Sequence, residues 1–512
     1  MTGEAVATGS PPAVSDLGGS VGRGVSWSAL NAVLLRSGQL LMGIVTARII
    51  APREFGVFAV ALTAFAIVAN VSDLGVGSAI LREVDRTRAI APTVYTLGIG
   101  TSVVLGGAMA LSAPYVATQF GASAAADAIR VLSLTVVIGA GGTVPAALIT
   151  RDYLQKRRFA SDAVWFVVAN VTLIPLALNG SGVMALAWSR VVAQFASTVV
   201  LITLTPERYR PGFDRREVRG LLRFGLPLAG ANLVAFSIAN LDFIVVGRLL
   251  GALRLGYYNL AYNVSSWPVS VFTAVLNNVT LTTLSRVRHS VTELEDHLSA
   301  ALSTLAAAAF PVSAMLMVLS DPLVRFLYGE RWSPSAPALA ALAAFGSLRV
   351  VIALLSDVLV ALGRTRRLML LQVIWISALL PALILGAHLR GIVGVGLAQV
   401  SVGAAVVLPA YLLAVSRGTG LGLGWLGKSV RAPLLATIVS GAAAWPVERH
   451  VHQPFLACVT AGAVGAVVYA AVLWPWARRH ITMLRRMYGS SGSRVDDSGP
   501  APTRSVPTAE PS

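Results

Sequence analysis

The sequence is poor in charged residues, and this shortage defines its class. Only 12% of the 512 residues are Asp, Glu, Lys or Arg, whereas 55% are hydrophobic. Soluble globular proteins carry about 25% charged residues. The composition therefore excludes an ordinary soluble domain and predicts an all-α polytopic membrane protein.

Cysteine, intramembrane histidine and long loops are also scarce. The single cysteine, Cys458, excludes an internal disulfide and a cysteine-based metal cluster. All six histidines fall in or beside predicted loops, so we expect no metal site and no cofactor. The longest predicted external loop covers only 321–335, which leaves little room for the catalytic carboxylates of a glycosyltransferase, polymerase or ligase. We therefore expect a transporter and not an enzyme.

Apolar stretches long enough to cross a bilayer, which takes about 20 residues, recur along the chain. We predict about 14 transmembrane helices, at 25–47, 55–79, 91–115, 131–150, 161–179, 182–204, 224–247, 256–281, 298–320, 336–362, 368–387, 391–415, 430–447 and 455–476.

The distribution of positive charge predicts the orientation. With the N-terminus inside, the cytoplasmic segments carry about three times as many Lys and Arg residues as the external loops. We therefore expect a multi-pass protein of the cytoplasmic membrane with both termini cytoplasmic. The net charge of +17 then belongs to loops at the anionic face of the bilayer, and nucleic acid is not an expected partner.

An internal repeat divides the predicted helices into two halves. The segment ARIIAPREFGVFAVA at 47–61 matches GRLLGALRLGYYNLA at 247–261 after a shift of 200 residues. Both copies join an odd-numbered span to the next one, as expected for a parallel repeat in a transporter. The predicted domains are a disordered cytoplasmic tail (1–24), an N-terminal six-helix lobe (25–204), an amphipathic cytoplasmic linker (205–223), a C-terminal six-helix lobe (224–415), an additional helix pair (416–476) and a basic, then disordered, cytoplasmic tail (477–512).

These segments resemble a known family. Together with VSDLGVGSAILRE, LRFGLPLAGANLV, FLYGERWSPSAPALAALA and ALGRTRR, the two repeat copies resemble the polysaccharide transporter family, the oligosaccharide flippases of the superfamily that also contains multidrug exporters and lipid II flippases. The resemblance covers residues 25 to about 415. It implies two lobes in a V around a central cavity, and export of a polyprenyl-pyrophosphate-linked oligosaccharide by alternating access. The implied partners are this glycan, the bilayer and polysaccharide assembly machinery; a monomer suffices for transport.

Arg36 is the first candidate site residue, because it lies near the middle of the first predicted span. A charge at that depth costs at least about 2.5–3.5 kcal/mol. An arginine offers two parallel hydrogen bonds to a pyrophosphate, so Arg36 is predicted to hold the head group, with Gln39 on the same helix face. The alternative is a structural arginine paired within the protein.

Further candidates share a polar or charged character inside predicted spans. Arg190 and Arg349 are predicted either to contact cargo or to be structural, and snorkelling is the stronger alternative for Arg190. Asp242 and Asp357 are predicted to couple a cation or to form structural ion pairs. The amides that are candidates for hydrogen bonds to sugars, or that tie helices together, are Asn31, Gln39, Asn170, Gln194, Asn232, Asn240, Gln372 and Gln399.

Two alternative functions remain at this stage. One is a cation-coupled multidrug or small-molecule antiporter of the same fold, for which acidic coupling residues are expected. The other is a scaffold that keeps the fold without transport. Nucleotide binding is excluded although GLGWLGKS at 422–429 matches the phosphate-loop pattern, because that motif needs a preceding strand and an α/β domain.

Overall fold

The computed structural model describes residues 38–72, 80, 86–152, 154–207, 209–284, 291–420, 422 and 424–489. These described residues are almost entirely helical and include no strand, which confirms the all-α fold class. The chain forms two compact units. Unit 1 contains residues up to Tyr262 together with Val324–Ala338 and Leu380–Ala398, and unit 2 contains the rest. The predicted domain bounds stay a prediction, and both predicted tails lie largely outside the described residues.

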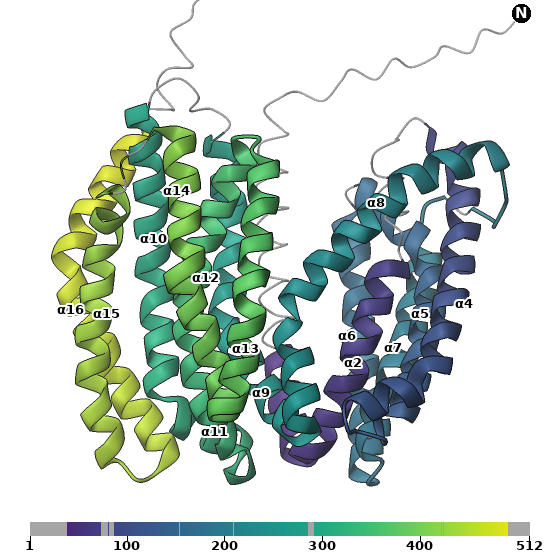
Figure 1. Ribbon diagram of the computed structural model, residues 1–512, viewed down its shortest axis with the longest axis horizontal. Helices are drawn as coiled ribbons and strands as arrows, with labels where there is room; N and C mark the ends of the chain where they lie inside the picture. Colours follow the sequence, from purple (N-terminus) through teal and green to yellow (C-terminus); the bar gives the residue numbers. More distant parts are fainter. Residues whose placement is uncertain are drawn as a thin grey trace, which may run out of the picture. The chain divides into compact units, whose positions relative to one another are not determined.

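Unit 1 is built on a group of long helices that pack side by side (Figure 1). They are the helix Gly38–Ile49, α2 (Pro52–Ser72), α4 (Thr87–Gln119), α5 (Ala125–Arg151), α6 (Gln155–Leu178), α7 (Gly182–Leu204), α8 (Arg215–Ala239) and the first part of α9 (Leu241–Leu284). The Asp214 carboxylate caps α8 by accepting a hydrogen bond from the backbone N–H of Arg216 at 2.9 Å. The predicted linker is therefore helical only from Arg215 onward.

The second half of the chain supplies the helices of unit 2 and two segments of unit 1. These helices are α10 (Val291–Val318), α11 (Ser320–Tyr328), η2 (Glu330–Ser335), α12 (Ala336–Ala361), α13 (Thr365–Val402), η3 (Gly403–Val407), α14 (Leu408–Thr419), α15 (Gly424–His450) and α16 (Pro454–Gly489). The α15 and α16 helices lie together and α15 packs on α10 (Figure 1). From Gly424 onward the phosphate-loop-like motif is part of α15, where the Ser429 hydroxyl donates to the Trp425 carbonyl at 2.8 Å.

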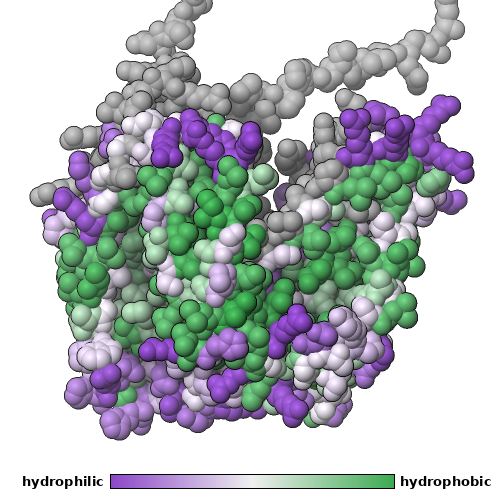
Figure 2. Space-filling view, viewed as in Figure 1, coloured by the Kyte–Doolittle hydropathy of each residue, from purple (hydrophilic) through white to green (hydrophobic). Residues whose placement is uncertain are grey.

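Ten helices among the described residues are long and apolar enough to cross a membrane. On the face that Figure 2 shows, hydrophobic residues occupy the middle and hydrophilic residues gather at the two ends. One of the ten, Arg366–Thr419, contains two predicted spans and breaks at Arg390 and Gly391, where the φ of Gly391 is +57°. Because the arms turn back on each other, Gly386 and Gly394 meet without room for a side chain. The chain is thus a multi-pass membrane protein, while the count of fourteen stays a prediction.

The two repeat copies touch each other through paired glycines inside unit 1. A Cβ atom on Gly56 would lie well inside contact distance of the Ala252 carbonyl oxygen, and one on Gly256 would meet the Pro52 carbonyl oxygen. Gly56 and Gly256 occupy equivalent positions of the repeat, and so do Pro52 and Ala252. The two contacts are therefore reciprocal. Each copy also contains a turn between two helices, at Ala51 and at Gly251, whose φ is +81°. The structure therefore brings together the segments that the sequence match pairs.

The segment 326–332 holds the first repeat copy in place. Arg48 donates from Nε to the Leu327 carbonyl at 2.8 Å and from its terminal nitrogen to the Phe326 carbonyl. In return, the Ala47 carbonyl accepts hydrogen bonds from Trp332 Nε1 at 2.8 Å and from Arg331 at 2.7 Å. We call residues 47–61, 247–261 and 326–332 the repeat junction.

Aromatic packing closes the repeat junction around Trp332. This indole is fully buried, and its ring meets Phe55 edge-on at 5.3 Å and Tyr257 at 6.1 Å. Phe55 belongs to the first repeat copy and Tyr257 to the second. Such edge-to-face pairs each contribute about 0.5–1.5 kcal/mol beyond the burial of their area. Trp332 therefore joins both copies to the same segment.

We predict that Gly56→Ala lowers the thermal stability of the purified protein, because the new methyl group must displace backbone and not a flexible side chain. Overpacking of this kind costs about 1–3 kcal/mol or more. The matched control is Gly98→Ala, a buried helical glycine with nothing within 4 Å of the new Cβ. Thermal unfolding in detergent, followed by size-exclusion chromatography, measures both variants. An unchanged midpoint for Gly56→Ala would contradict the close contact.

Candidate functional site

The structure describes only some of the predicted site residues. Arg36 lies outside the described residues. Gln39 is exposed on the helix Gly38–Ile49, and Arg349 and Asp357 are half-buried on α12 within unit 2. The cargo roles predicted for Arg36, Gln39 and Arg349 stay predictions, as does the cation-coupling or structural role predicted for Asp357.

Asn240 and Asp242 lie at the break between α8 and α9 and are held by local contacts. The Asn240 amide donates to the Phe236 carbonyl at 2.9 Å. Asp242 is buried, accepts a hydrogen bond from the Tyr258 hydroxyl at 2.6 Å, and accepts another from the Phe243 backbone N–H at 3.0 Å. These contacts hold the Asp242 carboxylate in place, and its predicted cation-coupling or ion-pair role stays a prediction.

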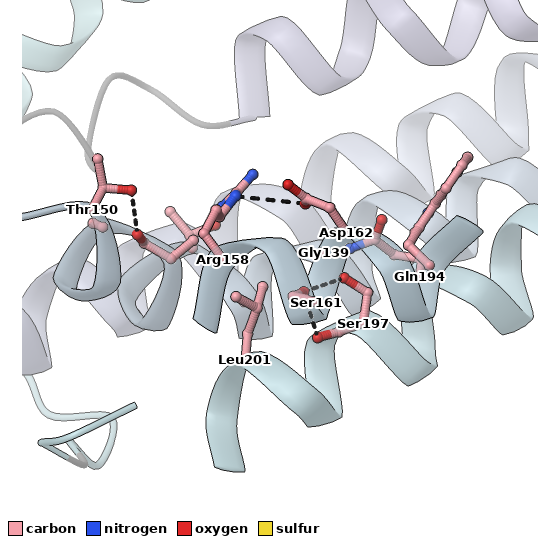
Figure 3. A pocket seen from close by; sticks show the side chains of 13 residues that line it. Gly139, Thr150, Arg158, Ser161, Asp162, Gln194, Ser197 and Leu201 are labelled. Atoms are coloured by element: carbon pink, nitrogen blue, oxygen red, sulfur yellow. Dashed lines mark hydrogen bonds and ion pairs between the residues drawn. The ribbon is translucent and has the colours of Figure 1, made fainter. Parts of the chain in front are cut away.

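A polar groove, which we name the α5–α7 groove, lies between three helices of unit 1 (Figure 3). Its volume is about 550 Å³. The lining residues come from three helices: Gly139, Gly142, Thr143, Ala146, Ala147 and Thr150 of α5, Arg158, Ser161, Asp162 and Trp165 of α6, and Gln194, Ser197 and Leu201 of α7.

Helical periodicity explains how the groove forms. On α6 the lining residues follow the spacing i, i+3, i+4, i+7 from Arg158 to Trp165, which places them on one face of the helix. On α5 the same spacing, starting at Gly139, selects small residues. The polar face of α6 therefore lies opposite a face of α5 that carries small side chains, and these small side chains leave the groove open.

The groove carries balanced charge and fixed hydroxyl groups. The Arg158 Nε lies 3.6 Å from the Asp162 carboxylate, and the two side chains are 43% and 46% exposed. The hydroxyl groups of Ser161 and Ser197 are 2.8 Å apart and join α6 to α7. The Gln194 amide lies 3.3 Å from the Thr198 hydroxyl. Hydrogen-bond donors and acceptors are thus present together without excess charge.

Arg190 contacts Trp165, one of the residues that line this groove. Its guanidinium carbon is 5.4 Å from the ring centroid of Phe58 and 5.9 Å from that of Trp165. At such distances the cation is attracted to the ring faces. The predicted arginine is therefore stacked between rings of α2 and α6, and does not line the groove. The helix Gly38–Ile49 begins nearby, because a Cβ atom on Gly38 would lie 3.0 Å from the ring of Phe166.

A second groove, which we name the α10–α15 groove, lies within unit 2 and is apolar. Its volume is about 800 Å³. Phe310, Met317, Val351, Leu434 and similar side chains of α10, α12 and α15 line it. The Ser303 hydroxyl donates to the Ser429 carbonyl at 3.0 Å and thereby ties α10 to α15. The additional helix pair thus supplies one wall of this groove.

Sequence reasoning identified Gln194 but missed Arg158, Asp162 and Trp165. Arg158 counts as a loop charge when positive residues are used only to assign topology. The spacing of Arg158, Ser161, Asp162 and Trp165 could have indicated this surface, because it places them on a single helix face. This face extends the polar character of the preceding loop into the span.

The sequence matches one protein family and is similar to several proteins of polysaccharide biosynthesis. The family described as "Polysaccharide biosynthesis protein" matches residues 45–337. The lipopolysaccharide biosynthesis protein WzxC of Escherichia coli (strain K12) is 27% identical over 73% of this chain and 76% of its own. The succinoglycan biosynthesis transport protein ExoT of Rhizobium meliloti (strain 1021) is 26% identical over 94% of this chain and 98% of its own.

Solved structures share the fold. The lipid II flippase MurJ in an inward closed conformation superposes with a TM-score of 0.69 at 15% identity, over 88% of this chain and all of that chain. An inward-facing multidrug resistance MATE family transporter gives a TM-score of 0.61 at 18% identity, over 76% of this chain and 95% of that chain. At these identities the likeness concerns the fold alone.

We predict that the α5–α7 groove is open to water. In a Cys458→Ser background, Thr143→Cys should react with a charged, membrane-impermeant maleimide in permeabilised vesicles, because the reactive thiolate forms in water. Two controls should not react: Ala140→Cys, buried on the same helix, and Val171→Cys, which is 66% exposed on α6 but outside the groove. An unreactive Thr143→Cys in a folded protein would show that water does not reach the groove.

Proposed function

Because the chain belongs to the polysaccharide biosynthesis protein family, we propose that it is a flippase for a polyprenyl-pyrophosphate-linked oligosaccharide. It moves this precursor from the cytoplasmic to the outer face of the cytoplasmic membrane by alternating access, with both termini cytoplasmic. The transport needs no covalent step, so the protein does not act as an enzyme. The lipid-linked glycan and the bilayer are its partners, together with the polysaccharide assembly machinery.

The observation that carries this proposal is a pair of grooves of opposite character on one chain. The α5–α7 groove is lined by ionic, hydroxyl and amide groups, whereas the α10–α15 groove is lined almost wholly by hydrocarbon. A cargo with a sugar head group and a long apolar tail suits both kinds of surface, since polar groups need hydrogen-bond partners and apolar chains do not.

The central test is a flipping assay in proteoliposomes that contain a polyprenyl-pyrophosphate-linked oligosaccharide. An externally added lectin measures the fraction of glycan that reaches the opposite leaflet, and protein-free liposomes give the background. We expect flipping above background. Absence of flipping, combined with cation-driven dye efflux by the same preparation, would instead support the multidrug antiporter that shares this fold.

We predict that Gly441→Trp slows flipping of the long-chain cargo, because the indole fills the α10–α15 groove. A Cβ atom added at Gly441 would lie 3.9 Å from the Val318 side chain, so the groove has room for a larger residue there. A fall of about tenfold corresponds to about 1.4 kcal/mol in the barrier. A farnesyl-linked analogue should be affected less. The control is Val439→Trp, which is exposed on the same helix and does not line the groove. Equal flipping rates for the two variants would show that the α10–α15 groove does not bind the lipid tail.

Arg36 is proposed to hold the pyrophosphate. Arg36→Leu should reduce flipping about tenfold or more, because a charge-assisted hydrogen bond contributes about 1.5–3 kcal/mol. Arg36→Lys should keep part of the activity, since it retains the charge but loses the planar fork. Arg53→Leu, at an exposed arginine of α2, is the control for a general loss of positive charge. Normal flipping by a correctly inserted Arg36→Leu protein would assign Arg36 a structural role.

A further inference from the structure

We propose that the α5–α7 groove binds an uncharged pyranose ring of the glycan, with Trp165 as its platform and Asp162 and Gln194 as its hydrogen-bonding groups. This inference rests on the proposed function, because it assigns one part of the cargo to one place on the chain.

The charge of the groove favours a neutral ring. Arg158 and Asp162 are the charged residues that line it, and they offset each other at 3.6 Å. A pyrophosphate or a uronic acid would need surplus positive charge, which this lining does not offer. Because both side chains remain nearly half exposed, at 43% and 46%, the carboxylate can accept from one sugar hydroxyl while the guanidinium donates to a neighbouring one.

The indole of Trp165 matches the other face of a sugar. A pyranose presents apolar C–H groups on one side of its ring and hydroxyl groups around its edge. Trp165 lines the groove, and the Arg190 guanidinium carbon lies 5.9 Å from its ring centroid, a distance at which a cation is attracted to an indole. Asp162 lies one helical turn before Trp165, so a ring packed on the indole has the carboxylate within reach of its edge.

Gln194 completes the set from a second helix. Its side chain borders the space left by Gly139, where even a Cβ atom would lie 3.6 Å from the amide nitrogen. An amide both donates and accepts hydrogen bonds, as a vicinal pair of sugar hydroxyls requires. The volume of about 550 Å³ lies within the range of about 300–1,000 Å³ found for small-molecule sites.

The test uses the full-length protein in lipid nanodiscs and saturation-transfer NMR with neutral methyl pyranosides of the gluco, galacto and manno series. Methyl glucuronoside and inorganic pyrophosphate are the charged probes. We expect saturation transfer to the ring C–H protons of at least one neutral pyranoside, and weaker binding of methyl glucuronoside than of the matched glucoside. Failure of all neutral probes to bind, or preferential binding of a charged probe, would overturn the proposal.

Variants locate the binding. Trp165→Ala and Gln194→Ala should each raise the apparent Kd for the pyranoside about tenfold, which corresponds to about 1.4 kcal/mol of binding free energy. Trp165→Phe should retain most of the binding, because an aromatic face remains. The control is Trp188→Ala, at a 42% exposed tryptophan of α7 that does not line the groove. Equal binding by Trp165→Ala, Gln194→Ala and the wild type would place the sugar elsewhere.

Flipping measured on the same proteins separates the two proposals. Flipping by the wild type, with sugar binding unaffected by Trp165→Ala and Gln194→Ala, would overturn this inference and leave the proposed function intact. Failure of the wild type to flip any lipid-linked glycan would overturn the proposed function itself. A sugar site that persists in that case would still confirm the chemistry of the groove.

Discussion

The bilayer requires that each backbone N–H and C=O group be satisfied within the chain, and the rest of the structure follows from this requirement. A helix meets it by itself, so the described residues are almost wholly helical. Departures from helical geometry are confined to a few places, among them Gly251 and Gly391. Gly391 forms the turn of a tight helical hairpin, and Gly251 separates two helices at the repeat junction. In both places a glycine adopts a positive φ that other residues rarely tolerate.

The same requirement organises the polar side chains. Asp242 is buried, but the Tyr258 hydroxyl and a backbone N–H meet its carboxylate. Arg190 lies between two aromatic rings, and Arg48 donates to carbonyls at the end of α11. The α5–α7 groove differs, because its ion pair is partly exposed and its walls leave space. Buried polar groups with partners stabilise the fold, whereas the Arg158 and Asp162 side chains of this groove stay partly exposed beside their partners.

The all-α fold class and the interruption between the spans 368–387 and 391–415 could be predicted from the sequence, because hydropathy is a local signal. Self-similarity identifies the two repeat copies, but their direct contact is seen only in the structure. The groove could not be predicted in the same way, since it depends on which faces of α5, α6 and α7 meet. Arg158 illustrates the difficulty. By its position in the sequence it reads as a loop charge, and only the packing of α6 against α5 and α7 places it in the lining of the α5–α7 groove. The sequence predicts Asp242 as an acidic residue inside a span, but its hydrogen-bond partner Tyr258, sixteen positions further along the chain, is seen only in the structure.

The reciprocal contact at the repeat junction has the symmetry of an isologous dimer interface, in which the same patch of two copies meets itself. Gly56 approaches the carbonyl of Ala252 as Gly256 approaches that of Pro52, with both relations offset by the repeat spacing. A chain of half the length that carried one such copy would therefore be self-complementary at this point. Within the single chain each side needs a glycine, because the other side's backbone occupies the space of a side chain. Most other paired positions of the two repeat copies carry different residues.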